Sequence, residues 1–491
     1  MARFILSLDQ GTTSSRSILF DENGVAVATS QYEFRQYFPE SGWVEHDAVE
    51  IWETQLKTML EVMEKVGVTE KDVAGIGITN QRETVLLWDR RTGEPVANAI
   101  VWQDRRTADL CRQMRDAGLE PAVSALTGLR LDPYFSASKV QWLLDHVEGA
   151  RERAEAGELC MGTIDSWLVY KLTEGKVHVT DATNASRTLL CNIHTGEWDD
   201  ILLGKFGVPR GVLPRIVDCT EVVGEWRGVP ISGMAGDQQA ALFGQACYAP
   251  GMAKNTYGTG CFMLLHTGDR VVRSQNQLLS TIALQRGGKR EYCLEGSVFI
   301  AGSLFQWLRD GLQLFDTVQE FDALAQSVPD SGGVVIVPAL SGLGAPHWDP
   351  FARGLITGLS RGTTKAHICR AAIEAVSFQS VELLECMQGD ASREISELRV
   401  DGGATASDLL MQVQADLMGC DLVRPEITET TAFGAAALAG LGVGFWESRE
   451  ALAAAWREEK RFSPQKGSSW RKGRRAEWDK AVRMAMSESG M

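Results

Sequence analysis

The segment from Asp9 to Arg16 is the first whose residue types and spacing could do chemistry. Asp9 follows the apolar run 4–8, which is typical of a buried strand and should hold the carboxylate firmly. Gly11 would permit a tight turn after it, and amides and side chains there could surround phosphate oxygens. The side chains concerned are those of Thr12, Thr13, Ser14 and Arg16. Asp9 itself can hold a hydrated Mg²⁺, which takes few protein ligands.

A plain hairpin built from ordinary turn formers explains the same segment about equally well. The segment lacks the Gly-Lys-Ser/Thr of a P-loop, so that phosphate-binding design is excluded. A matching turn, Gly258-Thr259-Gly260, stands in the second half, and two such turns could clamp a polyphosphate from both sides. Glycines in the segment 401–404 would let the backbone lie close to a flat ligand, although a simple strand-to-helix turn is as common there.

The segment 80–83, Asn-Gln-Arg-Glu, is the sharpest signal for a substrate with hydroxyl groups. Arg82 can donate to one oxygen of a vicinal diol, and Glu83 can accept from the other. The alternative is a surface ion pair on a loop, which would contribute little. Trp102, Tyr134 and Phe262 could wall a carbon skeleton, although each is equally credible as a core residue.

Asp237 precedes Gln238 at the expected start of a helix, where two roles are open. It could be a plain N-cap, or it could be a general base that accepts a hydroxyl proton. The helix dipole would lower the pKa of the carboxyl group and weaken it as a base. Phosphoryl transfer relaxes this conflict, because its loose transition state asks mainly for positioning and charge neutralisation.

The elements that must position these residues are expected in the same order in both halves of the chain. The first half is predicted to contain strands at 4–8, 17–20 and 73–79, with a helix that begins at a capping box of Asp47 and Glu50. The second half is predicted to contain strands at 252–255, 262–266 and 398–400, with a helix over 365–387. We therefore predict an α/β fold with two copies of one plan, joined near 236–251, and a ligand cleft between them.

Composition limits the classes of function. A chain of 491 residues exceeds the usual size of one domain, so two domains are expected. A formal charge of −15 argues against a general affinity for nucleic acid or anionic membranes. The ten cysteines are scattered, and the four with apolar neighbours are predicted to be reduced, buried thiols, namely Cys160, Cys261, Cys293 and Cys420. The chain lacks both a bilayer-spanning apolar run and a secretory signal, so we expect no membrane insertion and a cytoplasmic location. The basic tail around Trp478 is expected to form a surface helix that packs its tryptophan on the body.

Together these residues resemble the FGGY family of carbohydrate kinases, and the similarity runs from Phe4 to about Trp446. The segments 134–143 and 358–374 look like the two family signatures. Within the family, the stretches 77–84, 178–187 and 253–262 are similar to those of kinases that act on glycerol rather than on pentuloses.

The resemblance implies an actin-like ATPase fold of two duplicated ribonuclease-H-like domains with an active-site cleft between them. Residues 1–243 would bind substrate and phosphate, and residues 244–491 would bind the nucleotide. The implied reaction transfers the γ-phosphoryl group of MgATP to glycerol, giving sn-glycerol 3-phosphate and ADP. Asp237 would be the base, Arg16 would neutralise charge, and Asp9 would lie near Mg²⁺, bridged to it by water. The oligomeric state stays open between a homodimer and a homotetramer.

Two sets of ligand contacts follow from the same resemblance. Glycerol is expected to contact Arg82, Glu83, Trp102, Tyr134, Asp237, Gln238 and Phe262. The nucleotide is expected to contact Thr12, Thr13, Ser14, Arg16, Thr259, Gly302, Gln306, Gly403 and Ser407.

Two departures from the family pattern affect these expectations. Many relatives carry Asn at the position of Ser407, which puts that nucleotide contact in doubt. The stretch 224–229 is shorter than the Gly-rich loop with which some bacterial relatives bind fructose 1,6-bisphosphate, and only Arg227 remains there. No His lies between His194 and His266, so a regulatory phosphohistidine is not expected in that region. We hypothesise that both controls are absent.

Two rival functions remain. One is a sister kinase for another polyol or ketose, which would need room where the three aromatic residues stand. The other is a non-catalytic actin-like ATPase that serves as a chaperone or sugar-sensing scaffold. Arg82, Glu83 and Asp237 argue against the second, because a scaffold has no use for them.

Overall fold

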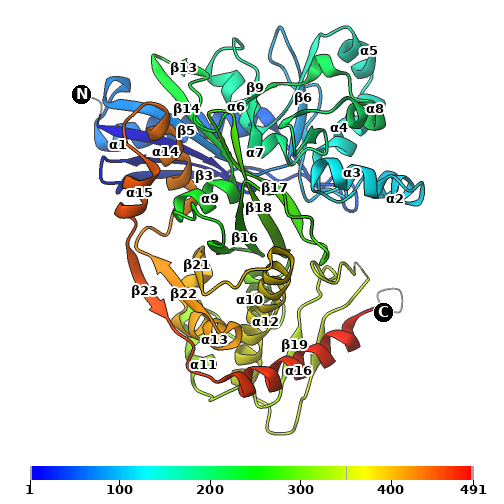
Figure 1. The fold of residues 1–491 in the computed structure, drawn as a ribbon, viewed down its shortest axis with the longest axis vertical. Helices are drawn as coiled ribbons and strands as arrows, with labels where there is room; N and C mark the ends of the chain where they lie inside the picture. The colour runs from blue at the N-terminus through cyan, green and yellow to red at the C-terminus, as the bar shows by residue number, and fades with distance from the viewer. Residues whose placement is uncertain (1–2, 350, 488–491) are drawn as a thin grey trace.

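The computed structural model describes residues 3–349 and 351–487, which form two lobes, each built around a mixed β-sheet (Figure 1). Residues 1–2 and 488–491, the outer ends of the two predicted domains, lie outside the described residues.

The first sheet has six strands in the order β13-β14-β5-β1-β2-β3. Their bounds are β13 (Gly224–Trp226), β14 (Val229–Gly236), β5 (Val73–Asn80), β1 (Phe4–Gln10), β2 (Ser14–Phe20) and β3 (Ala26–Glu33). The second sheet has seven strands in the order β17-β18-β16-β15-β21-β22-β23. Their bounds are β17 (Leu279–Arg286), β18 (Lys289–Val298), β16 (Cys261–Gly268), β15 (Ala253–Tyr257), β21 (Glu397–Asp401), β22 (Asp421–Pro425) and β23 (Glu458–Phe462).

The two sheets share one plan. In the first, β1 pairs antiparallel with β2 and parallel with β5. In the second, β15 pairs antiparallel with β16 and parallel with β21. The long runs of buried residues in β1 and β5 reflect the covering of both faces of a parallel pair. The predicted α/β fold with two copies of one plan is therefore confirmed.

Two long helices lie where the sequence predicts them. α1 (Ala48–Val66) packs on β2 and β3, and α12 (Lys365–Ala391) packs beside β16 and β18. The side chain of Asp47 caps α1 by accepting from the amides of Val49 and Glu50. The predicted capping box is wrong, because the Glu50 carboxylate accepts instead from the amide of Arg35, at 3.1 Å, in the chain that crosses this helix end.

α14 (Thr430–Gly442) belongs to the second half of the chain but packs on the first sheet, against β1, β5, β14 and α9 (Asp237–Gly244). Figure 1 shows it, in orange, beside β5 and β14 in the upper lobe. The approach to α9 is so close that a Cβ at Gly434 would lie 1.8 Å from the carbonyl oxygen of Ala240. Glycine is required there, and the two lobes are joined through this helix pair as well as through the chain itself.

The remaining elements complete the two lobes. A four-stranded sheet in the first lobe joins β4 (Glu45–His46), β7 (Ala99–Ile100), β6 (Val85–Asp89) and β8 (Leu159–Thr163). Two-stranded sheets pair β9 (Val179–Asp181) with β12 (Arg215–Val217), β10 (Cys191–Asn192) with β11 (Glu197–Trp198), and β19 (Val335–Val337) with β20 (Leu355–Thr357). The other helices are α2 (Ala108–Asp116), α3 (Glu120–Thr127), α4 (Ser136–His146), α5 (Ala150–Glu155), α6 (Ile164–Leu172), α7 (Ala182–Ala185), α8 (Asp200–Phe206), α10 (Gly302–Asp310), α11 (Val318–Gln326), α13 (Asp408–Met418), α15 (Arg449–Ala455) and α16 (Ser468–Ala485).

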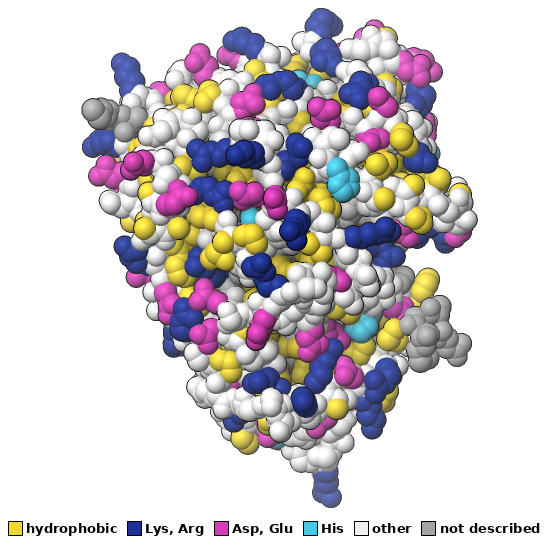
Figure 2. All heavy atoms as spheres, viewed as in Figure 1, with side chains coloured by type: hydrophobic (Ala, Val, Ile, Leu, Met, Phe, Trp, Pro, Cys, Tyr) yellow, Lys and Arg dark blue, Asp and Glu magenta, His cyan; other side chains and the backbone are white. Residues whose placement is uncertain are grey.

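The surface agrees with several expectations from composition. In α16 the ring of Trp478 is fully buried and stacks on Phe378 at 5.2 Å, as predicted for the tail. All ten cysteines are free thiols, and all but Cys386 are buried. Within residues 3–349 and 351–487, no helix combines the length and apolar character needed to cross a bilayer. Acidic and basic side chains are interspersed over the face drawn in Figure 2.

Candidate active site

The predicted phosphate turn connects β1 to β2. The amide of Gly11 donates to the carbonyl of Ser14 at 2.9 Å, which closes the turn. The backbone of Gly11 is outside the left-handed region, so the prediction that the turn needs its conformational freedom is wrong. Asp9 and Arg16 lie opposite each other in the ladder, and two guanidinium nitrogens of Arg16 donate to the Asp9 carboxylate.

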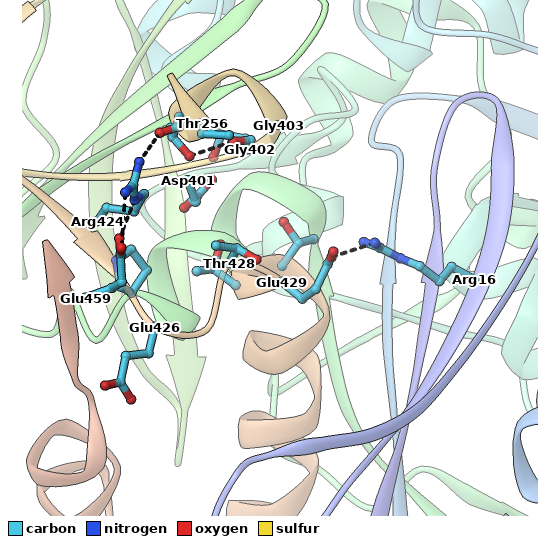
Figure 3. Close-up of a pocket in the computed structure, with 15 residues that line it drawn as sticks. Arg16, Thr256, Asp401, Gly402, Gly403, Arg424, Glu426, Thr428, Glu429 and Glu459 are labelled. Atoms are coloured by element: carbon cyan, nitrogen blue, oxygen red, sulfur yellow. Dashed lines mark hydrogen bonds and ion pairs between the residues drawn. The ribbon is translucent and has the colours of Figure 1, made fainter. Parts of the chain in front are cut away.

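Arg16 also reaches the second half of the chain. Its Nη1 lies 2.5 Å from a carboxylate oxygen of Glu429, the residue before α14 (Figure 3). Arg16 is therefore balanced by two carboxylates. Burial lowers the pKa of its guanidinium, but Asp9 and Glu429 outweigh that effect and raise the pKa above its ordinary value. An anionic ligand at this turn would have to compete with Glu429 for the guanidinium.

A cavity of about 650 Å³ opens beside this ion pair (Figure 3). Of the predicted residues, Arg16 and Gly403 line it. Asp401 and Gly402, from the predicted ligand segment 401–404, also line it. Its other lining residues include Thr256, Thr405, Arg424, Glu429, Thr430 and Glu459, which sequence reasoning did not single out as ligands. Arg424 is anchored by Glu459 and by the backbone carbonyl of Thr405. A cleft of this size with a glycine-rich floor suits a nucleotide.

The other predicted nucleotide residues lie outside the lining of this cavity. Thr259 and Gly302 come together, since amides at the start of α10 donate to the carbonyls of Gly258 and Thr259 at 2.9–3.1 Å. Gln306 is exposed on the same helix. Ser407 caps α13 through the amide of Leu410, and its hydroxyl donates to Asp322 at 2.8 Å.

The loop with Arg82 and Glu83 is buried, with the two residues 3% and 1% exposed, which excludes the surface ion pair. Glu83 has a φ of 61°, a left-handed conformation that is unfavourable for a residue with a side chain. Ser136 holds it by donating to the Glu83 carbonyl at 2.9 Å, and Arg187 Nε contacts its carboxylate at 2.6 Å. Backbone strain of this kind persists where surrounding contacts over-determine it, which is common at functional sites.

Arg82 connects the loop 80–83 to Asp237. Its Nε lies 3.0 Å from Asp237 Oδ1, and its two Nη atoms lie 2.5 and 3.0 Å from the carboxylate of Glu295 on β18. Gly236 makes this approach possible, because a Cβ there would lie 2.6 Å from Arg82 Cδ. The sequence allows Arg82 to lie against Asp237 because β14 ends in Gly236, immediately before the Asp237 carboxylate.

Asp237 is the first residue of α9, and the N-cap position belongs to Gly236, so the plain N-cap interpretation is wrong. The carboxylate accepts from the amide of Gln238 at 2.7 Å, and its side chain is 33% exposed. Burial raises the pKa of Asp237 above its usual value, while Arg82 and Lys254 partly offset the rise. The predicted conflict with the helix dipole is thus overcome, because a raised pKa makes a better base.

Lys254, on β15, links this cluster to the cavity. Its buried ammonium group donates to Gln238 Oε1 at 2.5 Å and to Thr256 Oγ1 at 2.8 Å. Burial lowers the pKa of Lys254, and Asp401 and Asp237 oppose that shift. Since Thr256 and Asp401 line the cavity, Lys254 stands between the polyol residues and the nucleotide pocket.

Two of the three predicted aromatic walls lie together. The rings of Trp102 and Tyr134 meet edge to face at 5.6 Å, and Trp102 Nε1 donates to Thr12 Oγ1 at 2.9 Å. Trp102 therefore connects the diol side to the phosphate turn. Phe262 lies on β16 in register with Thr256, and its place against a substrate stays a prediction.

Three buried charges of the site were missed by sequence reasoning, namely Arg187, Lys254 and Glu295. Each stands in a stretch with no charge pattern, so only side-chain contacts between separate segments of the chain reveal it. Arg227, the remaining candidate for a bisphosphate contact, pairs with Glu70 at 3.2 Å on the surface.

The Asp9 side fits a magnesium ion that arrives with a nucleotide. Asp9 supplies one carboxylate at the strand end, and Mg²⁺ commonly uses one or two carboxylates together with substrate phosphates. Among residues 3–349 and 351–487, no group of three or more His, Cys, Asp or Glu could hold a metal by itself. A magnesium ion here would therefore depend on phosphate oxygens for its other ligands.

Comparison with known proteins gives matches over nearly the whole chain. Residues 4–244 match the N-terminal domain, and residues 253–443 the C-terminal domain, of the FGGY family of carbohydrate kinases. A glycerol kinase from Deinococcus radiodurans is 59% identical over 489 residues, covering 98% of this chain and 97% of its own. The crystal structure of Plasmodium falciparum glycerol kinase with ADP superposes with a TM-score of 0.92 at 36% identity, covering 99% of this chain and 98% of that one. A ligand-bound xylulose kinase from Lactobacillus acidophilus has the same fold, with a TM-score of 0.86 at 22% identity, covering 98% of this chain and 96% of that one.

Proposed function

The chain belongs to the FGGY family of carbohydrate kinases, and we propose that it transfers the γ-phosphoryl group of MgATP to glycerol. The products are sn-glycerol 3-phosphate and ADP. The observation that carries the proposal is the 3.0 Å contact between Arg82 and Asp237, which sets a hydroxyl-binding cation beside a carboxylate of raised pKa. Identities of 55–59% to full-length glycerol kinases, against 22% to a xylulose kinase, favour glycerol over a larger ketose.

The polyol is held by the buried loop and the aromatic pair. Arg82 donates to one hydroxyl of the vicinal diol, and Glu83 accepts from the neighbouring one. Trp102 and Tyr134 flank the carbon skeleton, with Phe262 facing them from the second sheet. Gln238, fixed by Lys254, donates or accepts at the remaining hydroxyl.

Asp237 accepts the proton of the terminal hydroxyl as its oxygen attacks the γ-phosphorus. The pKa of its carboxyl group is raised by burial, so the carboxylate holds the proton better than an exposed aspartate would. Arg16 turns from Glu429 toward the phosphates and neutralises the charge that develops on them. Closure of the cleft excludes water and limits wasteful hydrolysis of ATP.

The nucleotide occupies the cavity lined by Arg16, Asp401, Gly403 and Arg424. Its phosphates lie toward Thr12, Thr13 and Ser14, and the far end extends toward Thr259, Gly302, Gln306 and Ser407. Asp9 would hold, through water, the magnesium ion that comes with the nucleotide, and such an ion would withdraw charge from the phosphates.

Further expectations rest on the same proposal. The division into residues 1–243 and 244–491 is supported by the two family matches, and α14 carries the second domain onto the first sheet. A cytoplasmic location, a homodimer or homotetramer, and the absence of control by fructose 1,6-bisphosphate stay predictions.

The proposal is tested by product identification. Purified protein with MgATP and glycerol should form ADP and glycerol phosphate in equal amounts, with the phosphate on a terminal carbon by phosphorus NMR. Formation of ADP and inorganic phosphate at the same rate with and without glycerol would support the scaffold ATPase instead.

A further inference from the structure

A buried carboxylate on the second sheet contacts two arginines of the first lobe, Arg82 of the polyol loop and Arg187, which follows α7. Glu295 lies on β18 and is fully buried. Its two oxygens lie 2.5 and 3.0 Å from the Nη atoms of Arg82, and Oε1 also lies 2.9 Å from Arg187 Nη2. Burial opposes the ionisation of Glu295, yet Arg187 and Arg82 lower its pKa to about 2, so it is a carboxylate at neutral pH.

Arg187 carries the chain of contacts on to the other diol residue. Its Nε lies 2.6 Å from Glu83 Oε1, its side chain is fully buried, and its guanidinium lies 5.6 Å from the ring of Tyr134. The four charges Arg82, Glu295, Arg187 and Glu83 therefore form one continuous network. Glu295 alone of the four comes from the second sheet.

The geometry points to Glu295 as a positioning residue that, with Arg187, orients Arg82 and Glu83 to bind the vicinal diol. This inference rests on the proposed function and goes beyond it. Because Arg82 and Arg187 both contact the carboxylate of Glu295, their side chains cannot rotate independently. The two-point contact with Arg82 also fixes the plane of its guanidinium. The Nε edge of Arg82 is thereby turned to Asp237.

The position of Glu295 has a second consequence. Because β18 belongs to the second sheet, the polyol loop of the first lobe has its correct geometry only when the two lobes are joined at this strand. Glu295, a residue of the nucleotide lobe, thus affects the affinity for the polyol without touching it.

The test compares Glu295→Gln with Glu291→Gln, a matched control on the same strand. Glu291 makes a similar two-point pair with Arg449, at 2.6 and 3.2 Å, far from the polyol residues in the register of β18. For Glu295→Gln we expect the KM for glycerol to rise at least about tenfold, with a smaller change in kcat and an unchanged KM for ATP. Glu291→Gln should keep all three constants.

An analogue separates positioning from general damage. Propane-1,3-diol lacks the vicinal pair, so its inhibition constant against glycerol should be affected much less by Glu295→Gln than the KM for glycerol is. Equal fold-changes for the two compounds, or a wild-type KM for glycerol in Glu295→Gln, would overturn the inference. If Glu295→Gln does not fold, Glu295→Asp decides by the same criteria, because the charge is kept while the shorter side chain cannot reach both arginines. Absence of glycerol turnover in the wild type would refute the proposed function itself, whereas wild-type turnover combined with equal fold-changes for glycerol and propane-1,3-diol in the variant would refute the inference alone.

Discussion

Arg82 Nε and Asp237 Oδ1 lie 3.0 Å apart, although one residue follows β5 and the other follows β14. These two strands are parallel neighbours in the first sheet, and their pairing brings Asn80 opposite Gly236. The carboxyl ends of adjacent parallel strands are where ligands bind in open α/β sheets. The cation that would bind the hydroxyl and the carboxylate that would take its proton are therefore placed by the sheet itself.

Replacement of Asp237 by Asn should preserve folding and remove most of the turnover. The amide can still contact Arg82 but cannot accept the proton, and a general base contributes about 10²–10⁴ in rate. Steady-state kinetics with glycerol, together with a thermal melt, measure both effects. Near-normal kcat in a folded variant would remove Asp237 from the mechanism.

Replacement of Lys254 by Met should move the acid limb of the pH profile. Lys254 lowers the pKa of Asp237, so loss of its charge raises that pKa further. Because the base must be deprotonated, kcat/KM will begin to fall at a higher pH as the solution is acidified. An acid limb at the wild-type position would show that Lys254 does not act on Asp237.

Replacement of Arg16 by Ala should lower kcat by about 10² or more, because it removes the charge that neutralises the transferring group. Arg210→Ala is the control, since this exposed residue makes a surface pair with Asp200 and should have no effect on turnover. A kcat within twofold of wild type in Arg16→Ala would place the phosphates elsewhere.

His46 should make the protein sensitive to acid. It is buried against Phe34, and its Nε2 donates to Gln36 Oε1 at 2.6 Å. Burial lowers the pKa of His46 to about 3. Below the unfolded value of about 6.5 the unfolded chain binds a proton that the folded protein does not. Stability therefore falls between pH 6.5 and about 3, by up to about 1.4 kcal/mol per pH unit.

The His46→Gln variant removes this titration but can keep a hydrogen bond to Gln36. Its melting temperature should fall less than that of wild type between pH 6.5 and 4.5. His178, whose pKa burial lowers to about 4, is unchanged in both proteins and serves as the common background. If the melting temperatures of the two proteins fell in parallel with pH, His46 would have to be protonated in the folded state.

The sequence was sufficient for the strands, the turns and the doubled plan, because these depend on local apolar runs and turn residues. It also predicted Arg82, Glu83 and Asp237, which stand in short polar segments next to apolar ones. It did not predict Glu295 or Arg187, whose importance arises only from contacts between strands and loops distant in the chain. The capping box failed for a similar reason, since the amide of Arg35 competes for Glu50.

The most direct test of the central claim is turnover across a panel of polyols and ketoses with MgATP. We predict that kcat/KM is highest for glycerol, lower for dihydroxyacetone, and lowest for erythritol and xylulose, because a larger substrate would need room where the rings of Trp102 and Tyr134 stand together. An absence of turnover with glycerol, together with turnover of xylulose or erythritol, would contradict the account.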